Sequence, residues 1–178
     1  VLADPPGQVL DLMTGLRKNN TGYDLKQLFV GTGGAGGIIT RAVLQVHPLP
    51  RQTATALIVP TGQDAILDLL IALEGEFGDF LTAYEGISKT CIEAVLDHMP
   101  SVSNPFAPEP IPDYMLLVEL SATASRDTLG MDLQEALNGF LEQQFDVLVA
   151  NALLDGGPDL WKIRHSISES IRHQGKLI

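Results

Sequence analysis

Apolar and polar residues follow two different periods in residues 51–178, and the changes of period mark the predicted elements. The segments typical of strands are 53–59, 80–86, 114–121 and a possible strand at 146–150. The segments typical of helices are 62–76, 88–98, 127–144 and 158–173. Strands that alternate with helices in this way indicate an α+β sandwich in which helices cover one face of an antiparallel sheet.

The helix expected at 62–76 has direct support from its residue types. Ile66, Leu69 and Leu73 recur at helical spacing, so they lie on one apolar face. Thr61 precedes them and has a side-chain oxygen suited to an N-cap. We therefore expect the helix to begin directly after Thr61.

Prolines predict two breaks in the chain. Pro48 and Pro50 separate two apolar segments of different character, which predicts a boundary near residues 48–52. Several prolines between residues 100 and 113 exclude regular structure there and predict a surface loop.

Residues 1–50 carry fewer elements than the rest of the chain. A short strand is expected at 9–12, a helical turn at 24–29 and a β-branched strand at 38–46, with a glycine-rich segment at 31–37. These elements are too few to build an independent core.

Composition and charge exclude some classes of protein. The 178 residues are 45% hydrophobic and carry 11 Lys and Arg against 22 Asp and Glu, giving a formal net charge of -11. No basic stripe is present, so nucleic acid is not an expected partner. No apolar run approaches the ~20 residues that span a bilayer. The single cysteine, Cys91, forms no internal disulfide, which favours a reducing, cytoplasmic location.

The glycine-rich segment matches a dinucleotide-binding pattern only in its letters. Residues 31–36 read G-T-G-G-A-G, which fits G-x-G-x-x-G. That fingerprint needs a strand before the glycines and a helix after them, since the pyrophosphate binds at the N-terminus of the helix. Here a helical turn precedes and a β-branched run follows, so a Rossmann site is not expected.

The residues around this segment carry a more specific resemblance. Residues 15–31 read G-L-R-K-N-N-T-G-Y-D-L-K-Q-L-F-V-G, residues 37–48 read G-I-I-T-R-A-V-L-Q-V-H-P, and together they closely resemble the FAD-linked oxidase family. That family includes glycolate oxidase flavin subunits, D-lactate dehydrogenases and D-2-hydroxyglutarate dehydrogenases. The resemblance implies that this loop and strand line the adenine and pyrophosphate side of FAD, through Gly31, Thr32, Gly34, Gly37, Ile38 and Ile39.

The loop loses the acidic, hydroxyl and leucyl side chains of the family pattern at three positions. The family usually has G-S-E-G-T-L-G, whereas residues 31–37 read G-T-G-G-A-G-G. Glycines without side chains still let backbone N–H groups approach an anion. A glycine turn without a ligand is the alternative interpretation.

A second resemblance lies in the last expected helix. Residues 160–170 read L-W-K-I-R-H-S-I-S-E-S, similar to the family segment L-W-x-[LI]-R-E-x-I-[ST]-E, with His165 in place of a glutamate. The resemblance implies that Arg164 and Ser168 bind a substrate carboxylate. A guanidinium suits this task because its planar fork makes two parallel hydrogen bonds. The alternative for Arg164 is a solvated surface charge.

Other side chains have plain structural interpretations. Trp161 is expected in the core, and Glu85 and Glu119, each inside a predicted strand, are expected to face solvent. The four histidines (His47, His98, His165 and His173) are scattered in the sequence rather than paired at i, i+4, so a metal site built from them is not expected.

The resemblance implies a function for a longer protein. Residues 1–50 would be the end of an FAD-binding domain, and residues 51–178 the first part of a ferredoxin-like substrate domain. The expected activity is oxidation of a D-2-hydroxy acid (lactate, glycolate or 2-hydroxyglutarate) by hydride transfer to FAD, with an unidentified electron acceptor. The catalytic and metal-binding residues would lie outside this chain, which alone would be inactive and would self-associate. A non-catalytic ferredoxin-like binding or assembly module is the alternative.

Overall fold

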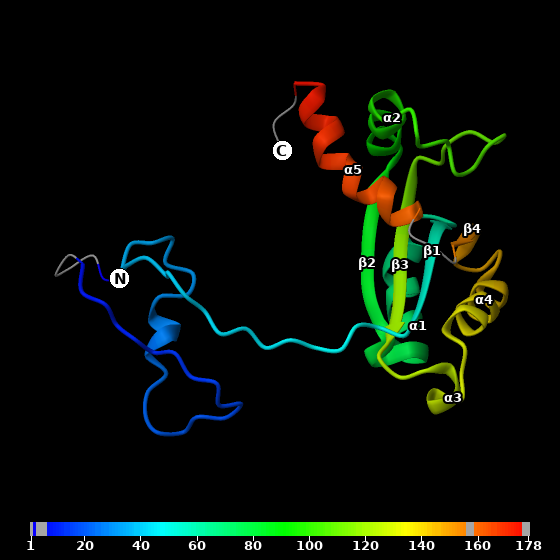
Figure 1. The fold of residues 1–178 in the computed structure, drawn as a ribbon. Helices are drawn as coiled ribbons and strands as arrows, with labels where there is room; N and C mark the ends of the chain where they lie inside the picture. The colour runs from blue at the N-terminus through cyan, green and yellow to red at the C-terminus, as the bar shows by residue number, and fades with distance from the viewer. Residues whose placement is uncertain (1, 3–6, 156–158, 176–178) are drawn as a thin grey trace. The chain divides into compact units, whose positions relative to one another are not determined.

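The computed structural model describes residues 2, 7–155 and 159–175. The chain divides into two compact units, Val1–His47 and Pro48–Ile178 (Figure 1).

The second unit is built on a four-stranded antiparallel sheet. Its strands are β1 (Gln52–Pro60), β2 (Leu81–Ser88), β3 (Tyr114–Ala122) and β4 (Val149–Asp155), in the order β2-β3-β1-β4. Both β1 and β2 pair antiparallel with β3, and β4 pairs antiparallel with β1. This order and direction are those of a ferredoxin-like sheet, so the expected α+β class is confirmed.

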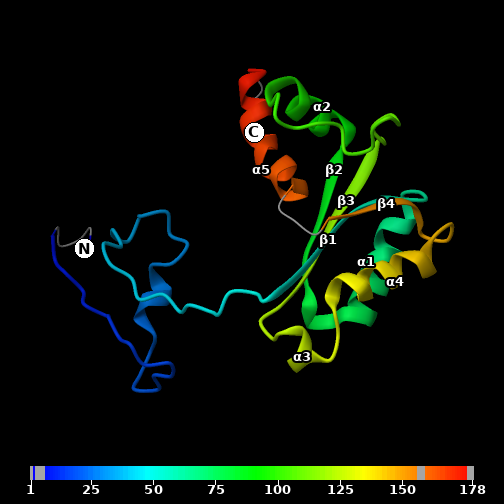
Figure 2. The ribbon, with the colours of Figure 1, turned by 45° about the vertical axis from the view of Figure 1, so that its right-hand side comes forward.

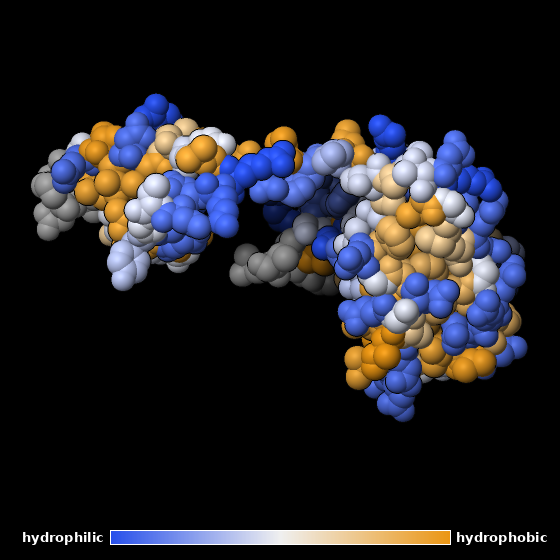
Figure 3. Space-filling model, turned by 90° about the horizontal axis from the view of Figure 1, so that it is seen from below, coloured by the Kyte–Doolittle hydropathy of each residue, from blue (hydrophilic) through white to orange (hydrophobic). Residues whose placement is uncertain are grey.

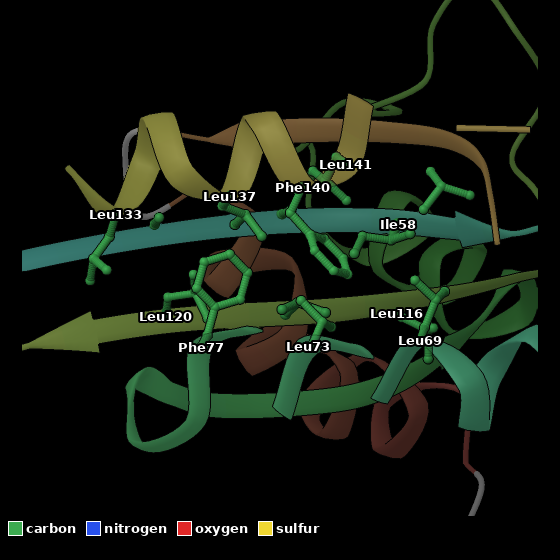
Figure 4. Close-up of a cluster of buried hydrophobic side chains, with 14 of the residues drawn as sticks. Ile58, Leu69, Leu73, Phe77, Leu116, Leu120, Leu133, Leu137, Phe140 and Leu141 are labelled. Atoms are coloured by element: carbon green, nitrogen blue, oxygen red, sulfur yellow. The ribbon is translucent and has the colours of Figure 1, made fainter. Parts of the chain in front are cut away.

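One face of the sheet carries an apolar core beneath α1 (Asp64–Phe77) and α4 (Leu133–Gln144). Figure 4 shows side chains of the two helices pointing toward each other over β1 and β3. The rings of Phe77 and Phe140 meet edge to face, with centroids 5.6 Å apart. Alternate strand residues, including Ile58 and Leu116, complete this core because successive side chains of a strand point to opposite faces.

The opposite face is covered by α2 (Lys89–His98) and α5 (Asp159–His173), as Figure 2 shows. Leu57, Met115 and Leu117 point from the strands into a second, smaller core on this side. The expectation of helices on one face is therefore correct only for α1 and α4. The correction has a physical cause: β3 is apolar at both phases of its alternation, so both faces need a cover.

The helix expected at 127–144 is two helices. Gly130 adopts a left-handed φ of 69° and ends α3 (Arg126–Leu129), and Asp132 then caps α4 by accepting hydrogen bonds from the amides of Gln134 and Glu135. The last strand also starts later than expected, at Val149.

The start of α1 differs from its prediction. A 3-10 turn, η2 (Gly78–Phe80), follows α1, which itself begins at Asp64 rather than directly after Thr61. Thr61 instead donates its hydroxyl to the carbonyl of Val147 and its amide to that of Leu148. It therefore ties β1 to the segment before β4 and does not cap the helix.

The first unit has a different character. Its one regular element among the described residues is the 3-10 turn η1 (Leu25–Leu28), and no described residue in 7–47 is buried. The strands expected at 9–12 and 38–46 are wrong: the described part of this unit holds a single isolated bridge, between Leu2 and Gly37. Strand-forming residues need a partner strand and a covered face to form a sheet. Apolar side chains therefore remain on the surface of this unit, at the left of Figure 3.

Candidate functional site

The candidate site lies where α5 crosses the sheet. Apolar residues of α5 at helical spacing, Leu160, Ile163 and Ile167, pack into the second core. On the sheet below, Glu85 of β2 shares a face with Ile87, and Glu119 of β3 shares it with Leu117. Two carboxylates therefore point from neighbouring strands toward α5.

Arg164 reaches from α5 to the first of these carboxylates. Its Nε donates a hydrogen bond to Glu85 Oε2, and the two side chains are 37% and 35% exposed. Within the described residues this is the one bond the guanidinium makes, which leaves its two Nη groups without a protein partner there. An arginine held in this way has its outer edge ready for an anion.

Trp161 reaches the second carboxylate, one helical turn earlier on α5. Its Nε1 donates to Glu119 Oε2 at 2.6 Å, and Thr82 donates its hydroxyl to Glu119 Oε1 at 2.9 Å. The imidazole of His165 stacks on the indole with ring centroids 5.4 Å apart. The expected core position of Trp161 is thus only half right, because the ring packs against the second core but is partly exposed and hydrogen-bonded.

The solvent-facing positions expected for Glu85 and Glu119 are wrong. Both are partly buried under α5, and each accepts a bond from a helix side chain. A polar residue inside a strand usually faces water, and nothing in its own type indicates a helix above it. The phase could have revealed Glu119, since it alternates with the buried residues Met115 and Leu117.

Ser168 lies one helical turn after Arg164 on α5 and is exposed to solvent. Residues four positions apart on a helix are neighbours on its surface. The hydroxyl can therefore donate a hydrogen bond to an anion that the Nη groups of Arg164 bind. Together the two side chains form the candidate anion site.

The glycine segment lies in the first unit, beside a groove. Gly31, Gly33 and Gly34 have φ values of 82°, 59° and 87°, a left-handed region that L side chains rarely adopt. The groove has a volume of about 250 Å³ and is lined by residues 9–14 and 37–43.

The residues expected to bind the cofactor divide into two sets at this groove. Gly37, Ile38 and Ile39 line it, together with Lys26 and Arg41. Gly31, Thr32 and Gly34 are not among its lining residues and form turns instead, with the Thr32 hydroxyl donating to the carbonyl of Phe29 at 2.9 Å.

Two histidines that are distant in the sequence meet at the ends of two helices. His98 ends α2 and His173 ends α5, with ring centroids 4.3 Å apart. The fold thus brings together two histidines that no i, i+4 spacing pairs in the sequence. Within the described residues, however, no group of three or more His, Cys, Asp or Glu side chains could hold a metal ion.

A bilayer-crossing helix is not found in the described part of the chain.

Comparison with known proteins identifies relatives along nearly the whole chain. No family model matches. The chain is 34% identical over 183 residues to the mitochondrial D-2-hydroxyglutarate dehydrogenase of Rattus norvegicus, which is 98% of this chain and 32% of that protein. It is 33% identical over 175 residues to the D-2-hydroxyglutarate dehydrogenase of Stutzerimonas stutzeri, 94% of this chain and 35% of that protein.

A more distant relative carries a related name. The chain is 28% identical over 142 residues to a D-2-hydroxyglutarate–pyruvate transhydrogenase of Saccharomyces cerevisiae, which is 80% of this chain and 27% of that protein. The chain thus spans about a third of the length of the curated relatives it matches. The resemblance is confirmed: the chain is a homologue of one segment of the D-2-hydroxyglutarate dehydrogenases of the FAD-linked oxidase family.

Proposed function

We propose that the chain is part of an FAD-dependent oxidoreductase that oxidises a D-2-hydroxy acid to the 2-oxo acid. The hydroxyl carbon loses a hydride to the flavin and the hydroxyl loses a proton to a base, so two electrons leave the substrate. We place that base and any metal outside this chain. The relatives named as D-2-hydroxyglutarate dehydrogenases make 2-hydroxyglutarate the first substrate to test, before lactate and glycolate.

The observation that supports this proposal most is the state of Arg164. Its guanidinium is partly exposed, bonded at Nε to Glu85, and without a described protein partner at its Nη groups. A carboxylate can accept two parallel hydrogen bonds from that edge, and Ser168 can add a third from the next turn. We assign both residues to binding a substrate carboxylate.

The first unit is proposed to contribute to binding FAD, as the end of a flavin domain. Side-chain-free, left-handed positions at Gly31 and Gly34 leave backbone amides open to a pyrophosphate, and Thr32 lies between them. Gly37, Ile38 and Ile39 line a groove that suits an adenine ring. Absorbance near the flavin band would test how much of this site the chain carries alone; we expect the isolated chain to be colourless.

The test of the substrate assignment is steady-state kinetics of the complete protein. Arg164→Lys keeps the charge but loses the planar fork, so kcat/KM for a 2-hydroxy acid should fall. The fall should correspond to a loss of about 1–3 kcal/mol of transition-state stabilisation. Ser168→Ala should have a smaller effect in the same direction. Bound flavin should stay normal in both variants. Unchanged kcat/KM in Arg164→Lys would refute the assignment, and loss of flavin would give Arg164 a structural role.

Partners and compartment are further parts of the proposal. We assign no electron acceptor. Self-association is proposed because the first unit exposes apolar residues such as Val9, Leu44 and Val46. Light scattering over a range of concentrations tests it. We propose a cytoplasmic location, although the printed names of some relatives include the word mitochondrial. Cell fractionation would decide between the two compartments.

A further inference from the structure

We propose that Glu85 is a positioning residue for Arg164, which holds the guanidinium by Nε so that its Nη edge is presented to the substrate carboxylate. This inference rests on the proposed function, because it needs Arg164 to bind the substrate. It adds a residue from a different element, 79 positions earlier in the chain.

The geometry of the contact supports positioning. Nε lies on the inner edge of a guanidinium, and the two Nη groups form its outer edge. Glu85 bonds to Nε alone among the described residues, so the outer edge stays available while the plane of the group is fixed. A carboxylate bound to both Nη groups would instead compete with the substrate.

The backbone below Glu85 makes it a firm anchor. Glu85 lies in the middle of β2 and is in register with Leu117 of β3, which is fully buried. The guanidinium is carried by a helix that packs on the same face. A flexible arginine side chain has several rotamers, and a hydrogen-bonded carboxylate on a paired strand restricts them before the substrate arrives.

Charge alone gives the opposite expectation for a variant that lacks Glu85. Removing a negative charge beside Arg164 strengthens the attraction between the guanidinium and an anionic substrate. If Glu85 only neutralised Arg164, KM would fall in Glu85→Ala. If Glu85 positions the guanidinium, KM rises despite the stronger attraction. The sign of the change in KM therefore separates the two roles.

The experiment compares variants of the complete flavin-loaded protein with a 2-hydroxy acid as substrate. Glu85→Ala should raise KM about tenfold, by analogy with the lower end of the effect of losing a hydrogen-bond partner that orients a metal ligand, with kcat changed less than about twofold. Glu85→Gln keeps an acceptor oxygen for Nε and should restore part of the loss. The inhibition constant of the 2-oxo acid product should rise in parallel with KM.

The matched control is Glu119→Ala, which breaks the bond between Trp161 of α5 and the sheet without touching Arg164. Its KM should stay within about twofold of wild type. An equal rise of KM in Glu119→Ala and Glu85→Ala would mean that looser packing of α5 is the cause, and would overturn the proposal. An unchanged or lowered KM in Glu85→Ala would also overturn it.

A separate variant, Arg164→Lys, tests the assignment of Arg164 to substrate binding. If Arg164→Lys impairs kcat/KM and Glu85→Ala leaves KM unchanged, the positioning role fails and the substrate assignment stands. If Arg164→Lys has wild-type kcat/KM, the substrate assignment itself fails. If Glu85→Ala does not fold, Glu85→Gln is used in its place, alone and together with Arg164→Lys. Because a positioning residue acts through Arg164, Glu85→Gln should cause no further loss of kcat/KM in the Arg164→Lys background.

Discussion

The two faces of the sheet are built from different chemistry. Under α1 and α4 the face is mostly apolar, with leucines and two phenylalanines packed over β1 and β3. Under α2 and α5 the core is smaller, and two strand carboxylates bond to side chains of α5. Apolar burial stabilises without direction, whereas hydrogen-bonded charges fix orientation. The first face supplies most of the apolar burial, and on the second face the bond between Glu85 and Arg164 orients the candidate anion site.

The largest expected effect is on the apolar face. Leu73 of α1 is fully buried, so Leu73→Ala should lower the free energy of unfolding by about 2–5 kcal/mol through lost burial and a cavity. Leu67 on the same helix is 62% exposed, and Leu67→Ala should change stability by less than about 0.5 kcal/mol. Urea unfolding followed by circular dichroism measures both. Equal effects at the two positions would contradict the assignment of this face.

A smaller effect is expected where α5 bonds to the sheet. Trp161→Phe removes the bond from Nε1 to the Glu119 carboxylate and should cost about 1–2 kcal/mol of unfolding free energy. The same substitution in a Glu119→Gln background should cost less, because that background lacks the charged acceptor. An undiminished cost there would mean that ring packing, and not the hydrogen bond, provides the stabilisation.

A polar contact at the edge of the apolar face makes stability depend on pH. The Tyr84 hydroxyl donates to the carbonyl of Ile66, and burial raises the pKa of Tyr84 to about 12. The unfolded phenol ionises first, near pH 10, so the advantage of wild type over Tyr84→Phe is complete below pH 10 and is lost as pH rises toward 12. Thermal unfolding from pH 8 to 12 measures it. Tyr23→Phe is the control, because the Tyr23 side chain is 98% exposed and has no buried hydroxyl to lose.

The smallest effect expected lies on α5. The Ser170 hydroxyl is fully buried and has no hydrogen-bond partner among the described residues. Ser170→Ala should therefore stabilise the protein by about 0.5–1 kcal/mol, since it removes an unsatisfied polar group and favours the helix. Ser166→Ala should be close to neutral, because the Ser166 hydroxyl already bonds to the Lys162 carbonyl. Destabilisation by Ser170→Ala would show that the hydroxyl has a partner after all.

Much of the second unit follows from local patterns. Alternating and helical periods locate its strands and helices because each element buries one side of itself against the sheet. The sequence of β3 also indicates that both faces of the sheet are covered. Met115 and Leu117 alternate with Leu116 and Val118, and a strand that is apolar on both sides needs helices on both faces. The expectation of one covered face missed this.

The remaining differences depend on contacts between distant segments. The pairing of Arg164 with Glu85 joins positions 79 residues apart, and no local period reports it. The β-branched run at 38–46 has strand-forming residues but no partner strand among the described residues, so its composition alone predicted a strand that is not formed. Motif spacing located Arg164 and Ser168 on one helix, and only the fold shows which carboxylate Arg164 contacts.

The most direct test of the account asks whether Arg164 recognises a carboxylate. In the complete protein, kcat/KM for a 2-hydroxy acid is compared with kcat/KM for its amide, in wild type and in Arg164→Lys. We predict a strong preference for the acid in wild type that shrinks by about tenfold or more in the variant, because the amide cannot accept two charge-assisted bonds from the guanidinium. An acid-to-amide ratio that is the same in both proteins would contradict it.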